Sequence, residues 1–240
     1  MRCLAGIYAL LWLIPGFAII DLTVTWNTSW PVMLEGGWGL LFGALVAAPF
    51  AALALEPERS AAILQLIVVC LAIELAAALS LAWEAAVLGA VLAAQIVSII
   101  LGGPLRPLGS PRLSIPLLVV AAVGSGPWIG YALEMFAADR GNRPNSDITL
   151  GVDHYSVQGA LALALVGLTL LAGVWPRRLW PAAFGVAVSA AYLGVVSVAH
   201  RGTPAGFSTT WSWAAVAWGT AVAVAPWFSR GLDRPRSSQG

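Results

Sequence analysis

Two adjacent apolar stretches decide the fold, AAILQLIVVCLAIELAAALSLA (residues 61–82) and AAVLGAVLAAQIVSIIL (residues 85–101), with only Trp83 and Glu84 between them. A helix needs about 20 apolar residues to cross a bilayer, within a range of about 17–25. Each stretch has this length, and the two together are too long for one crossing. The pattern therefore predicts two membrane-spanning helices that are joined by a tight hairpin.

Six further stretches of this kind lie elsewhere in the chain. The eight predicted spans are 4–20, 36–55, 61–82, 85–101, 113–133, 157–175, 179–199 and 211–228. The composition agrees, because 60% of the residues are hydrophobic and only 10% are charged, against roughly 45–50% and about 25% in soluble proteins. We expect an all-α membrane protein, a bundle of about eight transmembrane helices that forms one domain over residues 1–240, with no soluble domain.

The arginines predict the orientation of the bundle. With the N-terminus in the cytoplasm, nine of the 12 basic residues fall on the cytoplasmic side, as the positive-inside rule requires. The three outer ones are Arg140, Arg143 and Arg201. An even number of spans then places the C-terminus in the cytoplasm too. The alanine-rich composition without lysine favours a bacterial origin, so we expect a multi-pass protein of the plasma membrane.

The same composition excludes several chemistries. All basic residues are arginine, so no lysine can form a Schiff base or bind phosphate in a P-loop. The two cysteines, Cys3 and Cys70, form no spaced motif, which argues against iron–sulfur, cysteine-zinc and c-type haem sites. No particular cofactor follows from the sequence, and nothing indicates a nucleic-acid partner.

Side chains able to do acid–base or metal chemistry gather in segment 134–158 and at the end of the seventh span. Asp153, His154 and His200 are the candidate catalytic residues, because a positioned imidazole is the commonest general base. The candidate metal ligands are Glu134, Asp153, His154 and His200. His154 begins one predicted helix and His200 ends the next, so the two imidazoles are expected to face each other. The alternative is that Asp153 only caps its helix.

The candidate ligand-binding residues are Arg140, Arg143, Arg201, Asp147 and Gln158. The planar fork of arginine suits phosphate and carboxylate groups. We therefore expect an outward-facing site for a polar, anionic ligand or partner, such as an anionic lipid or a lipid-linked ligand at the outer leaflet. The alternative is that these arginines pair with nearby aspartates.

Glu74 is the only ionisable residue within a predicted span. A charged carboxylate at the bilayer centre costs at least about 2.5–3.5 kcal/mol, so such a residue is a functional candidate. One hypothesis is a neutral Glu74 hydrogen-bonded to Gln95 across the hairpin. The other is a proton- or cation-coupled transporter that uses Glu74. An outer-face metal-dependent hydrolase and a non-catalytic subunit of a membrane complex are further alternatives, so the sequence leaves open whether the protein is an enzyme.

Overall fold

The computed structural model describes residues 1–23, 26, 30–142, 148–149 and 151–229. The helices are α1 (Arg2–Leu13), α2 (Ala18–Thr23), α3 (Val32–Gly39), the π-helix η2 (Leu40–Ala47), α4 (Ala48–Leu55), α5 (Ser60–Ser80), α6 (Trp83–Leu101), α7 (Ile115–Arg140), α8 (His154–Val174), α9 (Trp180–Ala199) and α10 (Thr209–Ser229). Two short strands, β1 (Ile148–Thr149) and β2 (Val152–Asp153), pair antiparallel just before α8.

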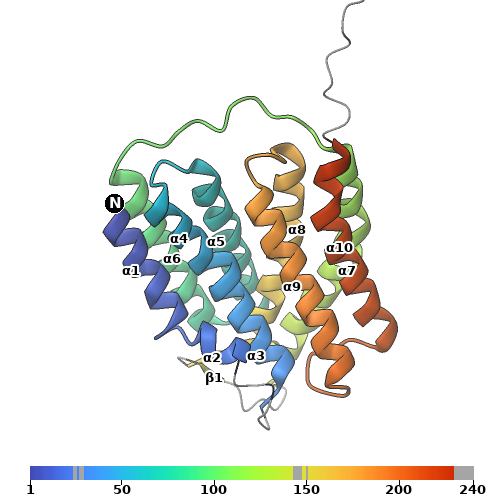
Figure 1. The fold of residues 1–240 in the computed structure, drawn as a ribbon. Coiled ribbons are helices and arrows are strands. Elements are labelled where there is room, and N and C mark those ends of the chain that lie inside the picture. The colour runs from blue at the N-terminus through green and yellow to red at the C-terminus, as the bar shows by residue number, and fades with distance from the viewer. Residues whose placement is uncertain (24–25, 27–29, 143–147, 150, 230–240) are drawn as a thin grey trace, which may run out of the picture.

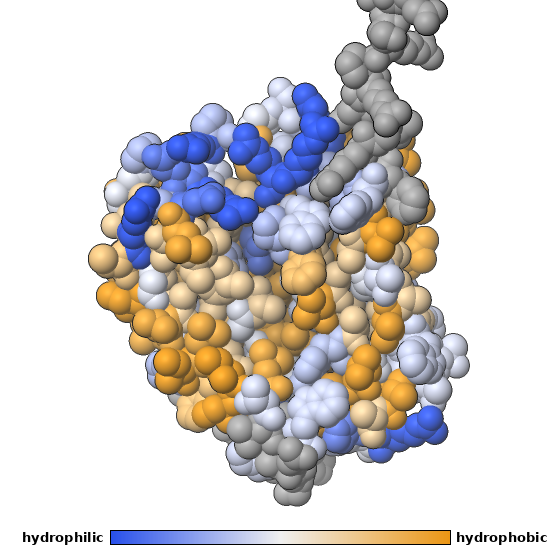
Figure 2. Space-filling model, in the orientation of Figure 1, coloured by the Kyte–Doolittle hydropathy of each residue, from blue (hydrophilic) through white to orange (hydrophobic). Residues whose placement is uncertain are grey.

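The described helices form one bundle in which the start of α1 and the end of α10 lie at the same end (Figure 1). Within the described part of the chain, six helices are long and apolar enough to cross a membrane: Val32–Leu55, which joins α3, η2 and α4, and then α5, α6, α7, α8 and α9. Figure 2 shows the matching surface, with apolar side chains between two ends where hydrophilic ones gather. An all-helical multi-pass protein in contact with lipid is thus confirmed. The full count of eight spans and the orientation of the termini stay predictions.

The hairpin that decides the fold forms as expected. Helix α5 ends at Ser80, α6 begins at Trp83, and Leu81 between them has a left-handed backbone with φ 62°. This turn sets α6 antiparallel beside α5. The length of the apolar stretch, rather than any long-range contact, was sufficient to predict it.

The first predicted span, 4–20, is not one continuous helix. Helix α1 ends at Leu13, and α2 begins only at Ala18. Pro15 lies between them and has no backbone N–H to continue the helical hydrogen bonds, and Phe17 has a positive φ of 62°. An uninterrupted helix was expected because the segment is apolar throughout. That expectation was wrong because Pro15 and Gly16 interrupt the helix.

The interruption is stabilised from the neighbouring span. The indole Nε1 of Trp38 donates a hydrogen bond to the carbonyl oxygen of Gly16 over 2.8 Å. A free carbonyl within hydrocarbon has no water to bond, so such a break persists only where protein supplies the partner. The adjoining η2 is a π-helix of eight residues, a conformation that is found frequently near functional sites.

Candidate functional site

An interior cluster of polar and aromatic side chains lies where α3, α7 and α8 meet. It consists of Glu35, Trp38, Tyr131, His154 and Gln158. Glu35 is 5% exposed, and His154 and Gln158 are fully buried. Burying polar groups costs free energy unless they find partners. This cluster is therefore the first candidate site.

The imidazole of His154 lies between a carboxylate and an indole. Its Nδ1 is 3.9 Å from Oε1 of Glu35, and its ring stacks on Trp38 with centroids 4.8 Å apart and planes at 25°. The position follows from the start of α8, where the carboxylate of Asp153 accepts a hydrogen bond from the Tyr155 backbone N–H over 2.8 Å. The capping role of Asp153 is thereby confirmed, and the cap turns the next residue into the bundle.

Gln158 links this cluster to α7. Its Nε2 donates to the hydroxyl of Tyr131 over 2.9 Å, and that hydroxyl donates to the carbonyl of Ala205 over 2.8 Å. Gly37 makes room for the amide, because a Cβ there would lie 1.5 Å from Gln158 Oε1. Glu35 and Gly37 were not singled out from the sequence. An acid followed by two glycines at the start of an apolar stretch was the available signal.

Replacing Tyr131 with phenylalanine is expected to lower the free energy of unfolding by about 1–3 kcal/mol, because Gln158 and the Ala205 carbonyl both lose a partner in a largely buried setting. Tyr8→Phe is the matched control, since among the described residues the Tyr8 hydroxyl has one hydrogen-bond partner, Ser98, at 3.0 Å. Unfolding in mixed micelles measures both. An equal or smaller loss for Tyr131→Phe would show that its two hydrogen bonds contribute little.

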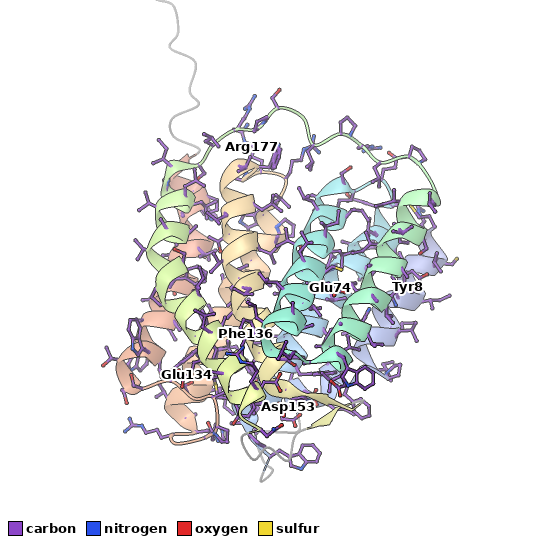
Figure 3. The ribbon with its side chains drawn as sticks, turned by 180° about the vertical axis from the view of Figure 1, so that it is seen from behind. Tyr8, Glu74, Glu134, Phe136, Asp153 and Arg177 are labelled. Atoms are coloured by element: carbon purple, nitrogen blue, oxygen red, sulfur yellow. The ribbon has the colours of Figure 1, made fainter. Side chains whose placement is uncertain are left out.

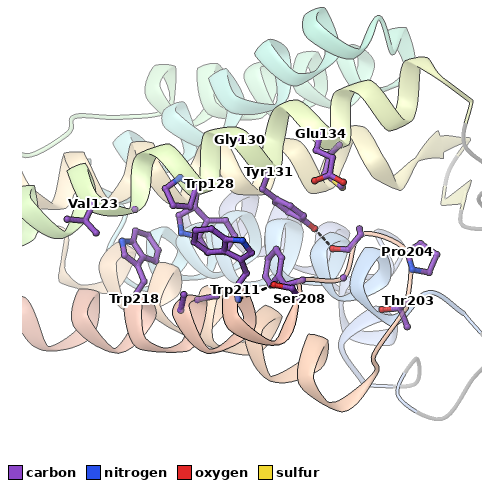
Figure 4. A pocket seen from close by; sticks show the side chains of 18 residues that line it. Val123, Trp128, Gly130, Tyr131, Glu134, Thr203, Pro204, Ser208, Trp211 and Trp218 are labelled. Carbon is purple, nitrogen blue, oxygen red and sulfur yellow. Dashed lines mark hydrogen bonds between the residues drawn. The ribbon is translucent and has the colours of Figure 1, made fainter.

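The second candidate is a pocket of about 680 Å³ between α7, α10 and the connection 203–208, which we call the aromatic pocket. Its aromatic lining residues are Trp128, Tyr131, Phe207, Trp211 and Trp218. Glu134 also lines it and lies exposed on α7. Figure 4 shows these side chains around the hollow, with the Tyr131 hydroxyl bonded to the connection that closes one side. Among the described residues, no basic side chain lines the pocket.

The walls of the aromatic pocket are packed against one another. The Trp128 ring is 5.8 Å from Phe207 and 5.7 Å from Trp218 between centroids. Trp218 Nε1 donates to the Val120 carbonyl over 2.8 Å, and Gly124 leaves space for this indole because a Cβ there would lie 2.1 Å from Nε1. The rings are thus held in place, and Tyr131 belongs to both the pocket and the interior cluster.

The predicted histidine pair has separate surroundings. His154 stacks on Trp38, whereas His200 meets Trp26 edge-on at 5.3 Å between centroids. Within the described ranges, no three His, Cys, Asp or Glu side chains are placed so that they could hold a metal ion. Of the candidate ligands, Glu134 lines the aromatic pocket and Asp153 caps α8. A catalytic role for the histidines stays a prediction.

The arginines of the predicted anion site are only partly described. Arg140 donates from Nη1 to the backbone carbonyl of Leu79, and Arg201 is exposed in the turn that follows α9. Arg143 and Asp147 lie outside the described residues. The anionic ligand at this end of the bundle therefore stays a prediction.

The hydrogen bond expected between Glu74 and Gln95 does not form. Gln95 Oε1 instead accepts from the indole of Trp12 over 2.8 Å, and Glu74 lies against α6 at Gly89, where a Cβ would be 2.3 Å from its Oε1. In an antiparallel hairpin, residues at equal distance from the turn face each other, and Gln95 lies about a turn and a half deeper than Gly89. Glu74 is half-buried midway along the bundle (Figure 3).

Comparison with known proteins assigns no family. No protein-family profile, no characterised protein and no solved structure matches this chain. The fold and the site define a multi-pass helical membrane protein with a buried carboxylate–imidazole pair and an aromatic pocket. Function has to be argued from these two features alone.

Proposed function

We propose that this membrane protein binds a cationic amphiphile in the aromatic pocket, at the outer leaflet of the membrane. The observation that carries the proposal is the lining of the pocket, which combines five aromatic residues with the carboxylate of Glu134. The described part of the lining has no arginine and no histidine. Such a lining attracts positive charge and does not repel it.

The faces of tryptophan and tyrosine rings attract a cation within about 6 Å, with roughly 0.5–1 kcal/mol at exposed sites and about 2 kcal/mol where water is excluded. The pocket also extends along α7 from Glu134 to Val123. At about 1.5 Å per residue this length is roughly 16 Å. The shape suits a charged head near Glu134 and an apolar tail toward the middle of the bundle.

The ligand proposed here is cationic, whereas the outer arginines led us to expect an anionic one. Arg140 and Arg201 are absent from the lining of the described pocket, whereas Glu134 belongs to it. The aromatic pocket nevertheless overlaps the candidate region, since segment 134–158 contributes through Glu134 and through the bond from Gln158 to Tyr131. The connection after α9 contributes Phe207. Eight crossings with cytoplasmic termini would put this end outside.

Binding is tested with three amphiphiles of equal chain length: octyltrimethylammonium, octyl sulfate and octyl glucoside. The protein is reconstituted in nanodiscs, and calorimetric titrations are corrected with empty nanodiscs. The ammonium compound is expected to bind most tightly. Glu134→Gln is expected to weaken its binding about fivefold, because an exposed charge pair contributes up to about 1 kcal/mol.

Trp211 and Trp213 provide a matched pair of aromatic substitutions. Both are exposed on α10, at 55% and 58%, but only Trp211 lines the pocket. Trp211→Ala is expected to weaken ammonium binding and Trp213→Ala to leave it unchanged. Octyl sulfate that binds as tightly as the ammonium compound would refute the proposal, as would an unchanged ammonium preference in Glu134→Gln.

Coupled transport is a second candidate, and the interior cluster favours it. Interrupted helices and buried ionisable groups near the middle of a bundle are common in transporters. The break between α1 and α2 is such an interruption, and Glu35 and His154 are buried ionisable groups that lie near one end of the bundle. In this alternative the coupling residues are Glu35 and His154 rather than Glu74, which the sequence suggested. The hydrolase and membrane-complex alternatives stay predictions.

A further inference from the structure

Three arginines converge on a recess at the opposite end of the bundle from the aromatic pocket. This recess, of about 660 Å³, lies between the connection 108–113, the turn from α8 to α9, and α10 at Pro226. Its basic lining residues are Arg112, Arg177 and Arg178. No acidic residue is among the described residues that line it. Figure 3 labels Arg177 at this end, away from Glu134 and Asp153.

The backbone brings these arginines together. The connection before α7 is bound to the end of α8, because the Arg112 N–H donates to the Val174 carbonyl over 2.9 Å and the Ser114 N–H donates to Gly173 over 2.7 Å. The indole of Trp175 donates to the Gly109 carbonyl over 3.2 Å. Arg112 is therefore held beside the turn that carries the other two arginines.

A neighbouring recess at the same end has a different charge balance. Its lining shares Arg177 and Arg178 with the first recess and adds the carboxylates of Glu56 and Glu58. Arg59 lies 3.8 Å from Glu56, and Arg106 is hydrogen-bonded to Glu58. The general excess of arginine at this end is thus partly balanced by carboxylates there. Among the described residues, the lining of the first recess, which we call the Arg112 recess, contains no such carboxylate.

Apolar side chains continue from this recess toward the middle of the bundle. Trp180 lines the recess and stacks on Phe184 with ring centroids 5.4 Å apart. Both rings are exposed, at 38% and 51%, and so is Val224 on α10. In a bilayer, exposed apolar groups of this kind face acyl chains. A basic recess above an apolar flank matches the two parts of a phospholipid.

We propose that the Arg112 recess binds the phosphate of an anionic phospholipid, whose acyl chains lie along α9 and α10. Arginine forks bind phosphate oxygens in pairs, and basic pockets between transmembrane helices bind anionic headgroups. The ligand, the charge and the end of the bundle all differ from those of the aromatic pocket. The two proposals therefore stand or fall separately.

The test uses the full chain in nanodiscs of phosphatidylcholine, with and without phosphatidylglycerol. The lipids that remain bound are counted by native mass spectrometry after release from the nanodisc. The wild-type protein is expected to retain phosphatidylglycerol several-fold over its share of the bilayer. Arg112→Gln/Arg177→Gln/Arg178→Gln is expected to lose this enrichment. Arg2→Gln/Arg106→Gln removes two arginines that line only the neighbouring recess and is expected to keep it.

Each other outcome overturns part or all of the proposal. Equal losses in the two variants would show that only the general positive charge of this end attracts the lipid. Glycerol phosphate that displaces the bound lipid at matched concentration would show a site for free phosphate instead. If the triple variant does not fold in phosphatidylcholine, as judged by circular dichroism, the three single Arg→Gln variants replace it. Unchanged enrichment in all three would then refute the site.

Discussion

Replacing Gly194 with alanine is expected to force α9 away from α10 and to lower the free energy of unfolding by about 1–3 kcal/mol, the usual cost of overpacking. A Cβ at this position would lie 2.5 Å from the carbonyl oxygen of Ser212 and 3.1 Å from the backbone nitrogen of Val216. These atoms belong to the backbone of α10, so no side-chain rotation relieves the collision. Leucine at this position should cost more.

The close approach of these helices has a second glycine. A Cβ on Gly219 would lie 2.7 Å from the Ala187 carbonyl oxygen. Small residues at such crossings allow the backbone packing that drives helix association in membranes. Because α10 also carries Trp211 and Trp218, Gly194→Ala is expected to weaken ligand binding in the aromatic pocket as well.

Gly130→Ala is the matched control for this substitution. Gly130 is also in a long helix, but a Cβ there meets nothing within 4 Å, so the change should gain up to about 1 kcal/mol through helix propensity. Unfolding of both variants in the same mixed micelles gives the difference. Equal effects of the two substitutions would contradict the close packing of α9 on α10.

Single substitutions of Glu35 and His154 are each expected to lower the free energy of unfolding, and the two losses should add up to more than the loss in the double variant. Both side chains are buried, with Oε1 and Nδ1 3.9 Å apart. Removing one member of a buried polar pair costs about 1–3 kcal/mol, because the other remains buried without it. Glu35→Met and His154→Phe keep most of the volume, and phenylalanine keeps a ring against Trp38. The double variant should recover part of the loss.

The measurement is a double-mutant cycle on the free energy of unfolding. A coupling of about 0.5–3 kcal/mol is expected for residues in contact. Glu74→Gln is the control, because Glu74 is only half-buried beside Gly89, and its effect should add independently to that of His154→Phe. Strict additivity of Glu35→Met and His154→Phe would contradict the pairing.

Features set by neighbouring residues could be predicted from the sequence. The hairpin of α5 and α6 follows from the length of two apolar stretches, and the cap by Asp153 follows from its place before α8. Two residues of the predicted site region belong to the candidate sites described above, since Glu134 lines the aromatic pocket and Gln158 bonds to Tyr131. Their function stays a prediction.

Features set by distant residues could not be predicted. Glu35 and His154 lie on different spans, and neither the length nor the apolarity of a span indicates which helix packs beside it. Gln95 was assigned to Glu74 from their depths, whereas Trp12 of α1 is its partner. The anionic ligand expected from counts of arginine stays a prediction, because counts do not show which side chains converge on one pocket.

The break between α1 and α2 has a consequence for how the chain enters the membrane. Twelve residues of α1 span only about 18 Å, less than the roughly 30 Å of the hydrocarbon core. The Gly16 carbonyl at the break is bonded by Trp38 of the next span. Until that indole arrives, the turn would leave a polar group in lipid. If the first predicted span lies in the bilayer, the first two segments are therefore expected to reach their final shape as a pair.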